Sequence, residues 1–290
     1  MIDYDPKSWL RIVLTLHGSV VPRLLVRVAI AAALGVLAVW LHRTNDASIP
    51  PLAHTLIGVA LGLLLVFRTN ASFGRYVEAR ELLGRIVNAS RDVARQVVAY
   101  VAPHPGKAAV CEDMQRWVGA FYWLLVQSVR DERDLGKLGE RLRADERARL
   151  EPARSRAPVV MTWLSARLVQ AQRDGHLDAE QLRAIDGNLG ALVAALGGCE
   201  RIRRTPVPFA YAQHIKIFVV LFCYTVPFAM AESLQAYAPV AAAVLAFALF
   251  GIDEIGVEIE DPFGTDPNDL PMERIGETVE GSLRDIVECG

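Results

Sequence analysis

The amino-acid sequence predicts an all-α membrane protein, with four transmembrane helices in two hairpins and a large cytosolic helical domain. The first observation is composition, because 52% of the 290 residues are hydrophobic and the mean hydropathy is +0.26. The second is the distribution of charge, because 23 of the 31 lysine and arginine residues lie between positions 68 and 204. The apolar stretches on either side of that basic region are therefore almost free of charge.

Four apolar stretches approach or reach the length of about 20 residues that a bilayer-spanning helix needs. They are residues 28–41, 47–67, 209–231 and 233–252. Only the third contains a charged residue, Lys216. The first extends back to Arg23 and Arg27, from which long side chains can reach polar surroundings. The alternative of four buried helices in a soluble protein leaves too little amphipathic sequence to cover them.

The same charge pattern predicts the orientation and the division of the chain. Lysine and arginine favour the cytoplasmic side, and the short loops of the two hairpins contain almost none. We therefore expect a multi-pass protein of the cell inner membrane with both termini cytoplasmic. The expected parts are a cytosolic N-terminal segment (1–22), a first transmembrane hairpin (23–67), a cytosolic helical domain (68–208), a second transmembrane hairpin (209–252) and an acidic cytosolic C-terminal segment (253–290).

The second apolar stretch carries the most information about function. Pro50-Pro51 suit a helix start, because proline lacks only an amide hydrogen that the first turn does not use. The helix is expected to leave the apolar zone at Arg68 and to continue as a polar helix to residue 96. Three apolar side chains recur every four residues and form one ridge: Val59, Leu63 and Phe67. From spacing alone, such a ridge is typical of a lipid-facing or packed surface.

An acidic stretch follows the last apolar segment. Its oxygen-bearing side chains are Glu254, Glu258, Glu260, Asp261, Asp266, Asn268 and Asp269. Glu254, Glu258 and Asp261 fall on one face of a helix that is expected to end at Pro262. Oxygen ligands at short spacing suit a hard cation, but their order does not match an EF-hand. Spacing alone therefore favours a solvated acidic loop and assigns no metal site.

The sequence contains no pattern of catalytic residues. Nucleophile-elbow, Walker and dinucleotide-binding motifs are absent, the six histidines lack metal-ligand spacing, and the four cysteines form no CxxC. The sequence thus predicts neither an enzyme nor a cofactor, and its net charge of −2 argues against nucleic acid as a partner. The basic middle region is expected to be helical, with its last helix over 176–199 ending at Gly197-Gly198.

Three segments together resemble the bestrophin family of membrane channels, and specifically its bacterial branch. They are FRTNASFGRYVEAR (67–80), RTPVPFAYAQHI (204–215) and FGIDEIGVEIEDPFGTDPNDLP (250–271). The resemblance covers nearly the whole chain and departs at Val77, where many bacterial relatives have an aromatic residue. It implies a homopentamer in which the second transmembrane helices surround one central pore.

On this resemblance, Val59, Leu63 and Phe67 match the three hydrophobic rings of the family's neck, and Ile202 matches a lower cytosolic aperture. Residues 260–269 resemble the calcium clasp of animal members, but a Pro-Phe-Gly sequence interrupts the acids, which argues against calcium gating. The resemblance implies passage of monovalent ions, with a preference for cations as in bacterial relatives or for chloride as in animal relatives. The acids would draw cations to the cytosolic exit. Membrane lipid is the remaining partner.

Two other classes of function stay open at the level of sequence. A secondary transporter predicts inverted repeats and broken helices, for which Pro227 is the single plausible break. A membrane-anchored interaction protein predicts that the cytosolic helices dock a partner without conduction. Unitary current steps from purified protein in a planar bilayer would distinguish a channel from both.

Overall fold

The structure, a computed structural model, describes residues 5, 7–46 and 49–290, and these residues form helices and connecting turns without a strand. Residues 1–4 and 6 of the expected N-terminal segment, and residues 47–48 of the second apolar stretch, lie outside the described residues. The chain divides into two compact units. The first unit comprises residues up to Tyr76 together with Pro206–Asp269, and the second comprises Val77–Thr205 and Leu270–Gly290.

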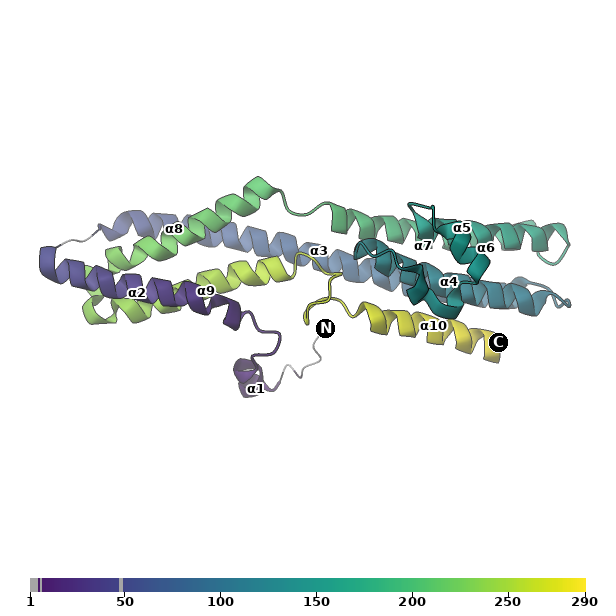
Figure 1. Cartoon of the computed structure of the whole chain (residues 1–290), viewed down its shortest axis with the longest axis horizontal. Helices are drawn as coiled ribbons and strands as arrows, with labels where there is room; N and C mark the ends of the chain where they lie inside the picture. The colour runs from purple at the N-terminus through teal and green to yellow at the C-terminus, as the bar shows by residue number, and fades with distance from the viewer. Residues whose placement is uncertain (1–4, 6, 47–48) are drawn as a thin grey trace. The chain divides into compact units, whose positions relative to one another are not determined.

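The first unit contains the apolar stretches, each of which is helical over most of its length. Its elements are α1 (Trp9–Leu14), α2 (Val21–Asn45), the first half of α3 (Pro51–Tyr100), α8 (Phe209–Leu234), the 3-10 turn η2 (Gln235–Tyr237) and α9 (Ala238–Glu258) (Figure 1). Three stretches are long and apolar enough to cross a membrane: Val21–Asn45, Pro51–Tyr100 and Phe209–Glu258. Gln235, which has a positive φ of 45°, interrupts the third and separates α8 from α9.

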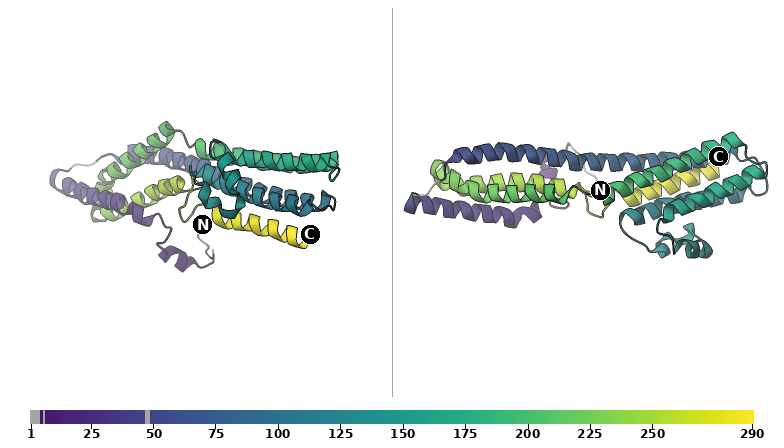
Figure 2. Two further views of the ribbon diagram at one scale, coloured as in Figure 1. Left: turned by 45° about the vertical axis from the view of Figure 1, so that its right-hand side comes forward. Right: turned by 90° about the horizontal axis from the view of Figure 1, so that it is seen from above.

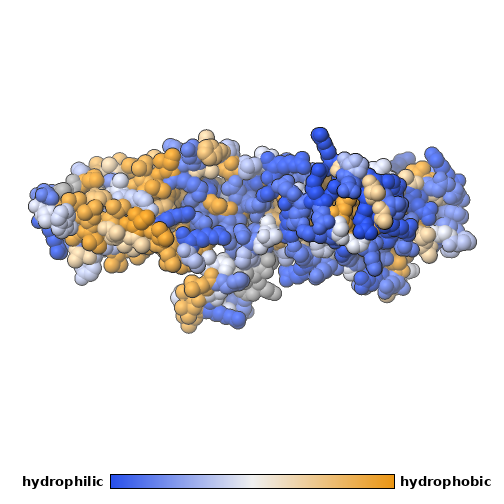
Figure 3. All heavy atoms as spheres, in the orientation of Figure 1, coloured by the Kyte–Doolittle hydropathy of each residue, from blue (hydrophilic) through white to orange (hydrophobic). Residues whose placement is uncertain are grey.

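Close packing of α2 and α9 depends on Gly35. A Cβ atom at this position would lie 2.6 Å from the Cα atom of Pro239, so only glycine permits the observed contact. The core of the first unit is shared by Leu24, Leu61, Leu65, Val219 and Phe222, among others. Many large apolar side chains nevertheless remain exposed, and hydrophobic residues cover the visible surface over α2, α8 and α9 (Figure 3). So large an apolar surface is expected where lipid or another protein covers it.

The second unit is a bundle of helices with a mainly hydrophilic surface (Figures 2 and 3). Besides the second half of α3, its elements are α4 (Lys107–Val129), the 3-10 helix η1 (Leu135–Arg141), α5 (Ala144–Leu150), α6 (Arg156–Arg173), α7 (Ala179–Arg204) and α10 (Met272–Cys289). The hydroxyl of Tyr122 on α4 donates to the carbonyl of Met272, at a distance of 2.6 Å, which ties the start of α10 to the bundle.

One predicted helix boundary is wrong, and one predicted continuation is confirmed. Helix α7 continues to Arg204, so the predicted end at Gly197-Gly198 is wrong. Gly198 serves packing instead, because a Cβ atom at this position would lie 2.8 Å from the Leu82 side chain. Helix α3, by contrast, begins at Pro51 and runs 50 residues to Tyr100, so the predicted polar continuation of the second apolar stretch is confirmed.

Candidate functional site

The ridge on α3 is exposed in the single chain. Val59, Leu63 and Phe67 have exposed fractions of 72%, 56% and 56%. At 100° per residue, their side chains lie within about 80° of one another over two turns. The exposed face then continues through Asn70 and Gly74, where it becomes polar. The ridge is therefore an apolar strip that ends where α3 leaves the apolar part of the sequence.

The opposite face of α3 is the one that packs within the first unit. Leu61, Leu65, Arg68 and Ser72 are at most 2% exposed and lie about 180° around the helix from the ridge. The packing is close, because a Cβ atom at Gly58 would lie 3.1 Å from the Phe222 ring. The subunit thus uses one side of α3 for its own core and leaves the ridge available for lipid or for other subunits.

A buried ion pair lies one residue beyond the ridge. The guanidinium of Arg68 on α3 is paired with the carboxylate of Asp253 on α9, and the two residues are 1% and 3% exposed. The Nζ atom of Lys216 on α8 lies 3.4 Å from the second oxygen of Asp253. Buried charges of this kind are expensive in a membrane protein and are retained when they are paired. The cluster joins three helices of the first unit directly behind Phe67.

Sequence reasoning placed Arg68 only as the end of an apolar stretch and did not single out Asp253. The signal in the sequence was a charged residue at the end of each of two long apolar segments. These residues, Arg68 and Asp253, are 185 positions apart. Charges that border separate spanning helices often pair, but the sequence alone offers several carboxylates as partners. Only the packing of α3 against α9 selects Asp253.

The first two predicted acids, Glu254 and Glu258, form ion pairs with α2. An oxygen of Glu254 lies 2.9 Å from Arg27, and an oxygen of Glu258 lies 3.2 Å from Arg23. The two glutamate side chains are only 12% and 6% exposed. Because α9 ends at Glu258, Asp261 does not share its helical face, and that part of the prediction is wrong. Glu254 and Glu258 therefore hold α2 against α9 and are not free acids.

The acids that follow α9 hold the chain in a compact turn. Glu260 accepts a hydrogen bond from the backbone amide of Val207 at 3.0 Å. The amide of Asn268 donates to the carbonyl of Gly18 at 2.8 Å and to Glu258 at 2.7 Å. These contacts connect the segment before α2, the segment before α8 and the segment after α9. Among the polar side chains that the sequence marked after α9, they involve Glu260 and Asn268.

Asp269 is the most perturbed carboxyl of this turn. It is 4% exposed, and one of its oxygens accepts a hydrogen bond from the backbone amide of Asp266 at 2.7 Å. Burial, aided by the charges of Asp266, Asp261 and Glu258, raises the pKa of Asp269 to about 6. Within the described residues, no group of three or more His, Cys, Asp or Glu side chains is arranged to hold a metal ion.

Ile202 lies on the last turns of α7 and is only 3% exposed in the single chain. Its match to a lower cytosolic aperture rests on the family resemblance and stays a prediction.

Comparison with known proteins identifies similar chains over nearly the full length. A family model described as "Bacterial/Fungal Bestrophin protein" matches residues 1–285. A voltage-dependent anion channel-forming protein of Ralstonia nicotianae is 36% identical over 287 residues, covering 96% of this chain and 92% of that protein. The Escherichia coli K12 protein of the same description, YneE, is 31% identical over 288 residues, covering 98% and 93%.

The fold is also similar to solved structures. The crystal structure of a bacterial bestrophin homolog from Klebsiella pneumoniae aligns with a TM-score of 0.86 and 27% sequence identity. The alignment covers 91% of this chain and 98% of the Klebsiella chain. Sequence and fold thus agree on the same group of membrane proteins.

Proposed function

The chain belongs to the bacterial and fungal bestrophin family, and on that premise we propose that it forms a channel for monovalent ions with α3 lining a central pore. Five copies of the chain would surround the pore, and Val59, Leu63 and Phe67 would form three apolar rings at its neck. The observation that carries this proposal is the exposed ridge, which lies opposite the face that α3 uses for its own core. Channel-forming names among the relatives support it over an enzyme.

The proposed topology has four crossings of the inner membrane. Helices α2, α8 and α9 contain 25, 26 and 21 residues, and at 1.5 Å per residue each exceeds the roughly 30 Å of a hydrocarbon core. The first half of α3 supplies the remaining crossing. Both termini and the second unit would lie in the cytoplasm, because the basic residues are concentrated there.

The neck would act as a gate through its lack of polar groups. Rings of apolar side chains offer no hydrogen bond to the hydration shell of an ion, so a narrow neck loses its water and closes. A small dilation readmits water and opens it. The buried pair of Arg68 and Asp253 would fix the rotation of α3 directly beyond Phe67 and thereby hold the rings toward the axis.

The neck carries no charge, so it discriminates weakly between cations and anions. The acids expected to favour cations are partly neutralised, because Glu254 and Glu258 are paired with Arg27 and Arg23. The curated relatives are named as anion channel-forming proteins. We therefore propose monovalent ions as the permeant class, and the reversal potential in a NaCl gradient measures which sign is preferred.

Two matched leucines test the neck. Leu63 on α3 and Leu221 on α8 are both 56% exposed in the single chain. Leu63→Ala should raise the open probability in planar-bilayer recordings, because it removes one apolar ring from every subunit. Leu221→Ala should behave like the wild type if it faces lipid. Equal effects of the two substitutions would refute the neck, and a native mass other than that of five 31.9 kDa chains would refute the pentamer.

The same recordings separate a channel from the other two functions. Helix α8 continues through Pro227 without a break, which does not favour the broken helices of a secondary transporter. A transporter or an interaction protein would give no unitary current steps.

A further inference from the structure

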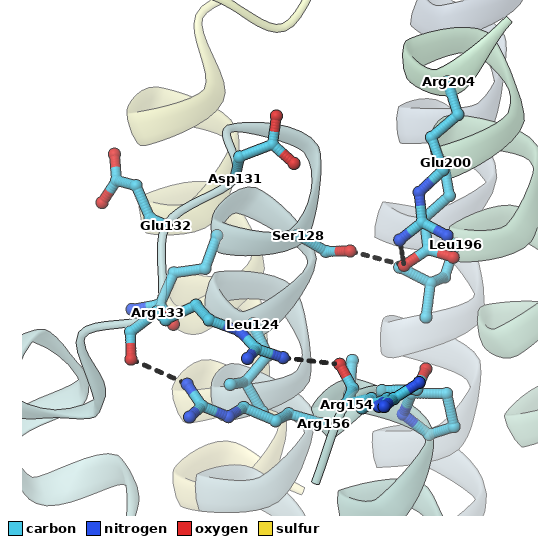
Figure 4. A pocket seen from close by; sticks show the side chains of 14 residues that line it. Leu124, Ser128, Asp131, Glu132, Arg133, Arg154, Arg156, Leu196, Glu200 and Arg204 are labelled. Carbon is cyan, nitrogen blue, oxygen red and sulfur yellow. Dashed lines mark hydrogen bonds and ion pairs between the residues drawn. The ribbon is translucent and has the colours of Figure 1, made fainter. Parts of the chain in front are cut away.

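A pocket rich in arginine lies inside the second unit, between α4, α7 and the start of α6 (Figure 4). Its volume is about 240 Å³. This is slightly below the roughly 300–1,000 Å³ of typical small-molecule sites, so the pocket suits a small ligand. Four arginines line it: Arg133, Arg154, Arg156 and Arg204.

The acids that line the pocket already have partners. Asp131 lies 3.3 Å from Arg203, and Glu132 lies 2.6 Å from Lys137. Glu200 accepts a hydrogen bond from Ser128 and lies 3.9 Å from Arg204, as Figure 4 shows. Each carboxylate is thus occupied by another side chain. The other three arginines, Arg133, Arg154 and Arg156, have no carboxylate partner among the residues that line the pocket.

Arg133, Arg154 and Arg156 form no ion pair with a carboxylate of the described residues. Arg156 donates instead to the backbone carbonyls of Arg133, at 2.7 Å, and of Glu151, at 3.2 Å. Its Nε atom is buried and has no hydrogen-bond partner in the described part of the chain. Burial and the nearby charge of Arg133 lower the pKa of Arg156. A bound anion would therefore stabilise the charged form of this guanidinium.

The first turn of α6 adds a second source of positive potential. Ser155, Ala157 and Pro158 line the pocket together with Arg156, the first residue of the helix. The side chain of Ser155 makes no capping hydrogen bond. Free amide groups at a helix N-terminus, together with the helix dipole, attract anions. The helix start and the arginines face the same cavity.

Gln127 provides an independent indication of a ligand site. Its side chain lines the pocket and is only 6% exposed. The Nε2 atom donates to the carbonyl of Asp134 at 2.6 Å, which determines the orientation of the amide. The Oε1 atom is buried without a hydrogen-bond partner among the described residues. An unsatisfied buried acceptor is costly, and a ligand with an O–H donor would satisfy it.

We propose that this pocket binds a small phosphate, either as the free ion or as a small monoester. Guanidinium groups bind phosphate oxygens through paired, charge-assisted hydrogen bonds. The P–OH group of hydrogen phosphate is a donor that matches Oε1 of Gln127. The pocket offers both the guanidinium groups and Oε1 of Gln127, and all residues that line it belong to the second unit.

Titration calorimetry of the full chain in detergent with inorganic phosphate tests the proposal. NaCl is adjusted to hold the ionic strength constant, so that screening does not imitate binding. Arg154→Gln should weaken phosphate binding about tenfold or more, because a charged hydrogen-bond partner is lost. Arg173→Gln is the matched control, since Arg173 is an exposed arginine in the last turn of the same helix α6, and it should leave the affinity unchanged.

The Arg154 variant is expected to fold, because its side chain is exposed and makes no hydrogen bond or ion pair with the described residues. Its unfolding temperature without phosphate should equal that of the wild type. A parallel titration with glycerol 3-phosphate assigns the ligand, since tighter binding than phosphate indicates a monoester and weaker binding indicates the free ion. Absence of saturable binding to the wild type, or an equal loss in the Arg154 and Arg173 variants, would overturn the proposal.

Discussion

Removing the charge of Asp253 is expected to destabilise the first unit strongly. Asp253→Asn leaves the guanidinium of Arg68 buried without a counter-charge, since the two side chains pair with each other and Arg68 is 1% exposed. A guanidinium keeps its proton in proteins, so deprotonation does not remove this charge. Lys216, at 3.4 Å from Asp253, would then face Arg68 as a second unbalanced cation. Breaking a buried pair in this way costs about 3–5 kcal/mol.

Replacing both partners should cost far less than replacing one. The pair itself contributes little net stability, because desolvation of two charges offsets their attraction. The Nε atom of Arg68 also lacks a hydrogen-bond partner within the described residues, so the guanidinium is incompletely satisfied. The double variant Arg68→Met/Asp253→Leu removes both penalties. It should therefore be close to the wild type in stability, or above it.

Thermal unfolding in detergent of the wild type, Arg68→Met, Asp253→Leu and the double variant Arg68→Met/Asp253→Leu forms a double-mutant cycle that measures the coupling. Each single variant should lower the unfolding temperature by several degrees, and the double variant should recover most of the loss. Asp92→Asn is the matched control, because Asp92 forms an exposed ion pair with Arg95 at 3.1 Å and exposed pairs contribute little. A loss in Asp253→Asn no larger than in Asp92→Asn would refute the reasoning.

Two further predictions concern packing and pH. Because its pKa is raised from 3.8 to about 6, Asp269 binds a proton more tightly in the folded state. Its ionised form therefore weakens the fold above about pH 6, and stability rises as the pH falls toward about 4. Asp269→Asn should raise the unfolding temperature at about pH 8, where the gain in stability is roughly 3 kcal/mol at most. It should change the unfolding temperature little at about pH 4. An equal change at both pH values would contradict this prediction. Gly35→Ala should destabilise the protein by roughly 1–3 kcal/mol, because the new Cβ would meet the backbone of Pro239. Gly62→Ala is the control and should be nearly neutral, since no atom lies within 4 Å of its Cβ position. Similar unfolding temperatures for the two variants would exclude a tight contact of α2 with α9.

Features of the fold that depend on neighbouring residues along the chain were predictable. The start of α3 at Pro51 and its continuation past Arg68 follow from proline geometry and from helix-forming sequence without a break. The apolar stretches are helices for the same reason, since length and hydropathy are local properties. The ridge of Val59, Leu63 and Phe67 also needs only the 100° rotation per residue.

Features that depend on distant partners were not predictable. Arg23 and Arg27 looked like border residues of the first apolar stretch, and Glu254 and Glu258 looked like free acids. In the structure they pair across more than 220 positions of sequence. Hydropathy and charge counts treat each residue as solvated, so they overstate the unpaired negative charge of the C-terminal stretch. The burial of Ile202 was likewise not predictable, because a position in the sequence does not tell which side of α7 faces the core.

The contrast between Phe67 and Arg68 shows why the candidate pore-lining face can be identified only from sequence and structure together. The two residues are adjacent, yet the phenylalanine is 56% exposed and the arginine 1%. The apolar residue is therefore outside and the charged residue inside, which is the reverse of a soluble helix. This inversion is stable only because Asp253 and the rest of the first unit satisfy the guanidinium. The same contact holds the rotation of α3, so the buried arginine, rather than any member of the ridge, keeps the ridge on the exposed face of the helix.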